Sequence, residues 1–381
     1  MKRFVVTCFG LLLAIVSASP NYGQTVYQFD GDTNDDFLVA ANWNDILAGP
    51  DAVPGPLDQA VINDNFVVKY DTAVATNVAS LIVGADWPVT GVLGTAGTLN
   101  MSAGSIQVNG PGNAFTIGRA CCAGTGVVNM SGDAALTIDG TDPTVGARDV
   151  GELNLSGTAT VTSPNSYWRF GNYGHNEDIF NPIGGLEGDG LLSVADNATF
   201  NGMFVFVGDN SSVGEIRVSD HGSVILTGNL IPRPSGFQAL GSAKIQMNGA
   251  NATLSAVTLE SASEVGEIPT LYEFNADPVF GVSPITLSNA VNITNNDLVV
   301  NLNGYPLISG GAPLLLFDAA PGQIYGTFAS SIVNGSVVPH RVIYDNLTGD
   351  VSVLRVPEPT TMLLLGLGMI TAICATRRES R

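Results

Sequence analysis

The chain has 381 residues and a formal net charge of −20, with 34 acidic against 14 basic side chains. Such an acidic surface repels nucleic acid and anionic membranes, which excludes both as partners of the main body. Charged residues make up only 13% of the chain, whereas 45 residues are glycine and β-branched residues are abundant. This composition is typical of many short strands joined by tight turns, and not of disorder.

The first element is a short apolar stretch at the N-terminus. Two basic residues, Lys2 and Arg3, precede an uncharged run over residues 4–16. Small side chains come after the run, as at a signal cleavage site, and cleavage nearer Gln24 is an alternative. The run is too short for a stable membrane span. We therefore expect residues 1–24 to form a secretory signal helix, with an N-terminal membrane anchor as the alternative.

Residues 25–76 are predicted to cap the N-terminal end of a repetitive region that begins at residue 77. The segment joins an acidic stretch, the Asn42-Trp43-Asn44 run and the strand-like run 60–62. A repetitive fold needs its ends covered, because open strand edges recruit other chains. We expect Trp43 to be the plug of this cap. The run resembles the start of autotransporter-like bacterial β-helix proteins.

The acidic stretch in this cap has a spacing that could hold calcium. Carboxylate and amide side chains occupy alternate positions, at Asp30, Asp32, Asn34 and Asp36. Oxygen ligands at this spacing can wrap a Ca²⁺ ion, but the central glycine and the downstream glutamate of an EF-hand are missing. A calcium site and a solvated acidic turn both remain open.

The central part of the chain is a degenerate repeat over residues 77–261. The clearest copies are segments 97–102, 126–131 and 151–156, which share a Gly-x-φ-Asn-φ-Ser pattern, where φ is apolar. Weaker copies begin near residues 190, 214 and 244, and equivalent apolar positions recur every 24 to 39 residues. Repeats of this length are typical of solenoids, in which each turn is covered only by its neighbours.

Within each repeat, apolar and polar residues alternate with the period of a β-strand. A glycine comes after the third short strand of successive repeats, at Gly84, Gly118, Gly146, Gly171 and Gly208. Three short strands with a glycine corner predict an all-β fold, a right-handed parallel β-helix. The alternative is an antiparallel sandwich or barrel.

Asparagine recurs at one position of the clearest repeats. Asn100, Asn129 and Asn154 each begin an Asn-x-Ser sequon. Glycosylation is one interpretation. The interpretation that we favour is that these side chains point outward and stack as a polar ladder between turns.

One repeat is longer than the others because residues 171–189 form an insertion. Long loops on a rigid scaffold often carry binding sites. The candidate binding residues are Tyr173, His175, Glu177 and Asp178. The alternative is a decoration that binds no ligand, since this spacing is not that of a metal site.

The repeat pattern fades after residue 261. Residues 262–355 keep strand-like periodicity, for example over 298–302, 314–317 and 351–354. We expect a separate C-terminal β module that covers the last turn of the solenoid.

The C-terminal tail, residues 356–381, has three parts in a fixed order. Val356-Pro357-Glu358-Pro359 comes first, an uncharged run over 361–376 comes second, and Arg377 and Arg378 lie near the end. Prolines stop the preceding strand, and terminal arginines stay on the cytoplasmic side of a membrane. The run predicts a single transmembrane helix, although it is short for a hydrocarbon core of about 30 Å.

This tail resembles the PEP-CTERM sorting signal of bacterial exported proteins, which is also described as an ice-binding protein C-terminal domain. The resemblance implies an exosortase-type processing enzyme as a partner, with membrane attachment at least until processing. A permanent single-pass anchor is the alternative. Ice binding would require a regular threonine ladder, and Thr98, Thr116, Thr137 and Thr160 do not recur at one repeat position.

Motifs for catalysis are missing from the sequence. The three histidines, His175, His221 and His340, lie far apart, and no nucleophile elbow, P-loop or zinc-protease motif occurs. Cys121 and Cys122 are adjacent, which leaves a strained vicinal disulfide open. We expect no enzyme activity and no cofactor beyond the calcium considered above.

Taken together, these features predict an exported cell-surface or extracellular-matrix protein with a structural or adhesive role. Its polar ladders could contact extracellular polysaccharide. The alternative is a carbohydrate-active β-helix enzyme or a polysaccharide-binding module, which would require carboxylates and an arginine to converge on one face of the solenoid.

Overall fold

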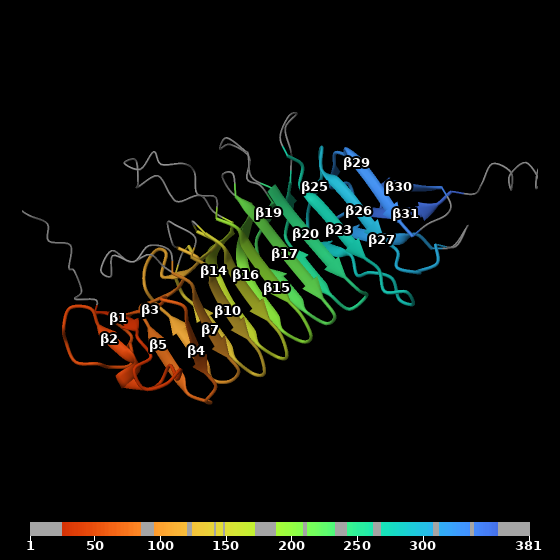
Figure 1. Cartoon of the computed structure of the whole chain (residues 1–381). Helices are drawn as coiled ribbons and strands as arrows, with labels where there is room; N and C mark the ends of the chain where they lie inside the picture. The colour runs from red at the N-terminus through yellow and green to blue at the C-terminus, as the bar shows by residue number, and fades with distance from the viewer. Residues whose placement is uncertain are drawn as a thin grey trace, which may run out of the picture.

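The computed structural model describes residues 25–84, 95–119, 124–140, 142–147, 149–171, 188–208, 212–232, 242–261, 268–307, 312–335 and 339–356. These residues form an elongated stack of short strands that runs from the N-terminal to the C-terminal end (Figure 1). The fold is an all-β parallel solenoid of about nine turns, with a single 3₁₀ turn, η1 (Ala40–Asn42), as its described helical element.

Each turn contributes one strand to each of three faces. The first face is one ten-stranded parallel sheet. Its strands are β4 (Phe66–Tyr70), β7 (Gly97–Met101), β10 (Gly126–Met130), β13 (Gly151–Leu155), β15 (Gly190–Val194), β17 (Val213–Ser219), β20 (Ser242–Asn248), β23 (Leu271–Asn275), β26 (Asp297–Asn301) and β29 (Ser330–Asn334).

The second and third faces join through two long strands that turn the corner between them, β14 (Thr160–Phe170) and β16 (Thr199–Val207). The other strands of the second face are β5 (Ala75–Val78), β8 (Ser105–Val108), β11 (Ala135–Ile138), β18 (Ser223–Leu226), β21 (Thr253–Ala256), β24 (Ile285–Leu287), β27 (Leu314–Asp318), β31 (Asp350–Arg355) and β30 (His340–Asp345). The other strands of the third face are β2 (Trp43–Asp45), β1 (Val26–Phe29), β3 (Gln59–Ile62), β6 (Ser80–Val83), β9 (Phe115–Ile117), β12 (Thr144–Val145), β19 (Leu230–Pro232), β22 (Leu259–Glu260), β25 (Val291–Asn292) and β28 (Ile324–Tyr325).

The sequence repeat sets the register of the first face. Leu99 of β7 lies opposite Val128 of β10, which lies opposite Leu153 of β13, and all three side chains are buried. Alternate residues of each strand point inward, so apolar positions two apart meet in one continuous core. The parallel β-helix prediction is therefore confirmed in its parallel, all-β character, and the antiparallel sandwich is wrong.

The predicted corner glycines adopt the conformation that favours glycine. The backbone dihedral angle φ lies between +68° and +72° at all five positions, Gly84, Gly118, Gly146, Gly171 and Gly208. A side chain at such a φ is strained, and each of these glycines ends a third-face strand. The glycine column therefore marks the corner at which the chain passes to the next turn.

An aromatic cluster closes the N-terminal end of the solenoid. The solenoid begins before the predicted boundary at residue 77, because β3, β4 and β5 already pair in parallel with β6, β7 and β8. Trp43 is fully buried, and its indole N–H donates to the Phe37 carbonyl at 2.7 Å. Its ring packs edge-on against Phe29 and Phe37, at 5.2 Å and 4.8 Å between centroids, and Phe37 in turn contacts Tyr70 of the first turn. Trp43 is the plug of the solenoid.

The C-terminal region differs from the sequence prediction. The parallel sheet does not end near residue 261, because β23, β26 and β29 continue the first face in register with β20. Antiparallel pairing in this region is limited, among the described strands, to the β30–β31 hairpin on β27 and a single bridge. Parallel pairing needs only alternating apolar residues, and this pattern survives after the Gly-x-φ-Asn-φ-Ser signature is lost.

Candidate functional site

Several predicted site residues lie outside the described part of the chain. These are the insertion residues Tyr173, His175, Glu177 and Asp178, and the tail beyond Val356, including Pro357, Glu358, Pro359, Arg377 and Arg378. The signal helix over 1–24 and the predicted span over 361–376 also lie outside it. Within the described residues, no helix has the length and apolarity that crossing a membrane requires. Val356 itself is placed, and its N–H donates to the Pro339 carbonyl at 2.8 Å.

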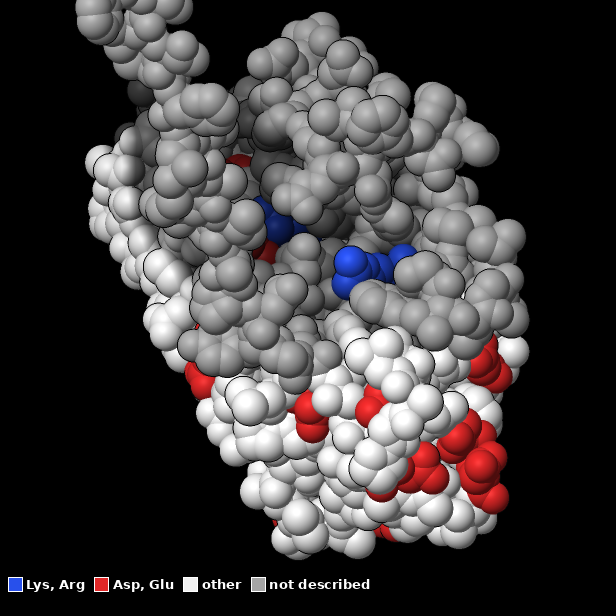
Figure 2. Space-filling model, turned by 90° about the vertical axis from the view of Figure 1, so that its left-hand side faces the viewer, with Lys and Arg blue, Asp and Glu red and all other residues white. Residues whose placement is uncertain are grey.

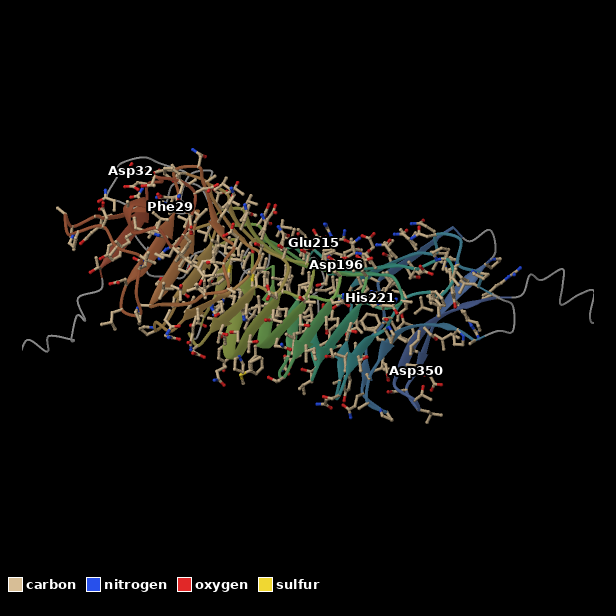
Figure 3. The ribbon with its side chains drawn as sticks, turned by 90° about the horizontal axis from the view of Figure 1, so that it is seen from below. Phe29, Asp32, Asp196, Glu215, His221 and Asp350 are labelled. Atoms are coloured by element: carbon tan, nitrogen blue, oxygen red, sulfur yellow. The ribbon has the colours of Figure 1, made fainter. Side chains whose placement is uncertain are left out.

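In the candidate calcium loop, side-chain oxygens accept hydrogen bonds from neighbouring groups of the same cap. Asn34 Oδ1 accepts bonds from Asn42 Nδ2 at 2.7 Å and from the Asp36 N–H at 2.9 Å, and Asp36 Oδ1 accepts from the Leu38 N–H at 2.8 Å. Burial raises the pKa of Asp30. Among the described residues, no group of three or more His, Cys, Asp or Glu side chains is placed to hold a metal ion. The structure thus does not gather Asp30, Asp32 and Asp36 around one point, and Asn42 organises the turn (Figure 3 labels Asp32 beside this cap).

The polar ladder predicted on the first face is present. Asn129 Nδ2 donates to Asn100 Oδ1 at 2.9 Å, and Asn154 Nδ2 donates to Asn129 Oδ1 at 3.0 Å. A second ladder, two positions further along the strands, joins Asn248, Asn275, Asn301 and Asn334 with bonds of 2.6 to 2.7 Å. Stacked amides of this kind satisfy one donor and one acceptor of each inner member, which fixes the outer surface of the sheet.

A charged network lies on the same face, on β17, β20 and β23, and it adjoins the second ladder, because Asn275 and Asn301 donate to Glu273. Lys244 Nζ lies 2.8 Å from Glu273 Oε2 and 3.7 Å from Glu215 Oε1. Arg217 Nη2 lies 2.9 Å from Glu215 Oε1, and its Nε donates to Gln246 Oε1 at 3.0 Å. Two carboxylates therefore meet two cations across neighbouring strands, and the network carries no net charge. Figure 3 places Glu215 near the middle of the solenoid.

The network lowers the pKa of one of its carboxyls, that of Glu273. Burial alone would raise the pKa of Glu273, but hydrogen bonds from Lys244 and Asn275 and the positive charges of Lys244 and Arg217 lower it below its ordinary value. A general acid in sugar chemistry needs the opposite shift, to a raised pKa. Glu273 therefore suits a hydrogen-bond acceptor better than a proton donor.

The lowered pKa gives a prediction on acid stability. Because the folded-state pKa of Glu273 lies below its unfolded value, its contribution is present above the unfolded pKa and is lost as the pH falls through the folded pKa. We expect Glu273→Gln to lower the free energy of unfolding at pH 7 by up to about 1 kcal/mol, because this ion pair is partly exposed. The deficit should shrink towards pH 3. Urea unfolding at both pH values measures it.

A matched control separates the ion pair from the loss of any carboxylate. Glu152 lies on the same face and accepts a bond from Asn154 at 3.2 Å. Glu152→Gln should show a smaller deficit at pH 7. Equal deficits for the two variants at both pH values would contradict the ion-pair role of Glu273.

Sequence reasoning missed this network and the second asparagine ladder. The available signal was spacing, because Lys244 comes one solenoid turn after Glu215, and Glu273 comes two residues beyond the next turn. Once register is known, Glu215 falls opposite Lys244, and Glu273 falls diagonally across from it. Arg217 and Gln246 are then placed by the two-residue period of the strand.

Comparison with known proteins identifies the tail. The family described as "PEP-CTERM protein-sorting motif" matches residues 355–378. The chain as a whole matches no curated protein and no solved structure. The predicted resemblance of the tail is therefore confirmed: the chain carries a PEP-CTERM sorting motif, which makes it an exported protein that is sorted at the membrane by an exosortase.

Proposed function

We propose that this exported solenoid is a structural or adhesive protein of the cell surface or extracellular matrix that contacts polysaccharide and catalyses no reaction. The contact surface is the outer side of the first face. The observation that carries the proposal is the ten-stranded sheet itself, whose asparagine ladders and charged network present ordered polar groups over its length.

The geometry of this face suits an extended polymer. Every strand pair of the sheet runs in continuous parallel register, and strands of a sheet lie about 4.8 Å apart. Amide and carboxylate groups therefore recur at regular steps, as do the hydroxyls of a sugar chain. Neighbouring turns already hold these side chains in place, so binding orders few of them further.

The charge of the surface favours a neutral polysaccharide. Acidic side chains are spread over the described surface at the N-terminal end (Figure 2), and the chain as a whole is strongly acidic. On the first face, Glu215 and Glu273 are offset by Arg217 and Lys244. A neutral polymer can therefore approach this face without the repulsion that an anionic one meets elsewhere.

The test is retention on an array of neutral extracellular polysaccharides with the secreted full chain. Asn275→Ala combined with Asn301→Ala removes the centre of the second ladder. Net hydrogen bonds are worth about 0.5–1.5 kcal/mol each, so losing two should weaken retention roughly tenfold. Thr162→Ala combined with Asn201→Ala is the matched control, because these outward side chains lie on the second face.

Equal melting temperatures would show that both double variants are folded. The control should then bind as the unsubstituted chain does. Loss of binding in both variants alike, or no retention of the unsubstituted chain on any neutral polysaccharide, would contradict the proposal.

A carbohydrate-active enzyme is the second candidate, because two carboxylates, an arginine and a lysine do converge on one face. We propose against it because the lowered pKa of Glu273 and its pairing with Lys244 make this carboxyl a poor proton donor. Incubation with the retained polysaccharide should release no new reducing ends and no unsaturated sugars. Release that is abolished by Glu273→Gln would establish the enzyme instead.

A further inference from the structure

The last strand of the first face, β29, has an uncovered edge. It pairs with β26 on one side, and no other described strand lies against its second side (Figure 1 shows it at the C-terminal end). The opposite end of the sheet is different. There the Phe37 N–H donates to the Lys69 carbonyl at 2.9 Å, and the Lys69 N–H donates to the Asp35 carbonyl at 2.7 Å, so the N-terminal cap covers the edge of β4.

The backbone of β29 shows which groups face the open edge. The Leu302 N–H donates to the Asn334 carbonyl at 3.0 Å, so Asn334 directs its carbonyl towards β26. Alternate residues of a strand direct their N–H and C=O groups to opposite sides. Ser331 and Val333 therefore direct these groups to the open edge, where a further strand could bind them.

The side chains of β29 do not protect this edge. Natural edge strands are commonly guarded by lysine, other charges or proline. The neighbouring terminal strand β30 carries His340, Arg341 and Asp345. By contrast, β29 reads Ser-Ser-Ile-Val-Asn, with no charge and no proline, and Ile332 is 52% exposed.

We infer that β29 pairs with β29 of a second copy of this chain, antiparallel and centred on Ile332. This register places Ser331 of each copy opposite Val333 of the other, so the edge N–H and C=O groups of both strands bond across the interface. Ile332 then faces Ile332 of the second copy as a non-hydrogen-bonded pair, in which side chains lie closest. On the same outer surface, Ser330 faces Asn334 of the second copy. The short sequence is thus self-complementary.

The shape of the C-terminal end agrees with such a two-fold pairing. On the second face, β31 lies beside β27 at the level of β29, and β30 extends one strand further. On the third face, the described strands end at β28, one level before β29. A two-fold axis perpendicular to the first face places the second face of one copy next to the third face of the other. The protruding β30 of one copy then lies at the level where the third face of the other copy has no described strand.

Charge and capping select a second copy rather than a stack of copies. The chain is strongly acidic, and an uncharged edge strand is a surface at which two copies meet with less repulsion than elsewhere. Head-to-tail stacking would need a free β4 edge, which the N-terminal cap already covers. The pairing is therefore closed at two copies and does not grow into a fibre.

Cross-linking of the full chain tests this inference. In the predicted register the two Ile332 Cα atoms lie about 4.5 Å apart, within the range of a disulfide. With the four native cysteines replaced by serine, Ile332→Cys should form a covalent dimer under mild oxidation, at roughly tenfold the yield of the control. The matched control is Val67→Cys, which is 49% exposed on the capped strand β4.

A second variant tests the backbone bonds. Ser331→Pro removes an N–H that faces the open edge, a position at which proline is tolerated in an edge strand. Added to Ile332→Cys, it should reduce the dimer to the level of Val67→Cys while the melting temperature stays unchanged. Equal cross-linking of Ile332→Cys and Val67→Cys, cross-linking of Ile332→Cys to a different protein alone, or a dimer that survives Ser331→Pro would overturn the inference.

Discussion

Replacing Gly190 with alanine is expected to prevent the solenoid from closing its central turns. Gly190 begins β15, and a Cβ atom there would lie 2.0 Å from the Gly171 nitrogen and 2.3 Å from the Val145 carbonyl oxygen. Both atoms are backbone atoms of the preceding turns, so neither can move away without disturbing the parallel ladder. Clashes of this kind rank among the most damaging substitutions, and we expect a loss of about 3–5 kcal/mol in the free energy of unfolding.

Urea unfolding of the secreted chain, monitored by far-ultraviolet circular dichroism, measures this effect. The matched control is Gly55→Ala. There the nearest atom to a new Cβ is the side-chain oxygen Asp58 Oδ2, at 3.3 Å. The control should change stability by about 1 kcal/mol or less. A Gly190→Ala chain as stable as the control would show that the turns are not held at this close approach.

Replacing Pro357, Glu358 and Pro359 together with alanine is expected to stop sorting altogether. The motif comes directly after β31, and it separates the last strand from the uncharged run of the tail. Because the family match spans this motif, the exosortase should no longer recognise the chain. We expect it to accumulate in the inner membrane with its tail intact, whereas the unsubstituted chain leaves that membrane.

Fractionation and immunoblotting measure this distribution. The control variant also replaces two prolines and one glutamate with alanine, as Pro56→Ala, Pro164→Ala and Glu260→Ala. These three residues are exposed on the described solenoid. The control should be exported normally. Export of the motif variant at the level of the control would contradict the role of the motif.

Part of the fold could be predicted from the sequence because the repeat is visible where turns have similar length. Segments 97–102, 126–131 and 151–156 indicated the correct register, and the ladder of Asn100, Asn129 and Asn154 results from it. The end of the solenoid could not be predicted in this way. Tyr272 and Phe274 take the places of aliphatic residues in β23. This turn therefore lacks the Gly-x-φ-Asn-φ-Ser pattern but still pairs in parallel with β20.

The candidate contact surface depended on register that the sequence alone does not supply. Glu215, Lys244 and Glu273 are regularly spaced along the chain, but solenoid turns vary from 24 to 39 residues between neighbouring repeats, so this spacing alone does not place the three residues on one face. Only the strand pairing shows that they meet on one face. The calcium loop shows the reverse case: the alternate oxygen side chains predict a ligand set from sequence, and the structure shows that Asn34 and Asp36 accept hydrogen bonds from nearby N–H groups.

The central claim is that a parallel β-solenoid is delivered outside the cell by a removable C-terminal tail. The most direct measurement is the intact mass of the mature chain, combined with the fraction from which it is recovered. We expect a chain that is found at the cell surface or in the medium, that ends near Pro357-Glu358-Pro359 and that lacks Arg377 and Arg378. Recovery of the chain only from the inner membrane, with Arg381 still present, would contradict it.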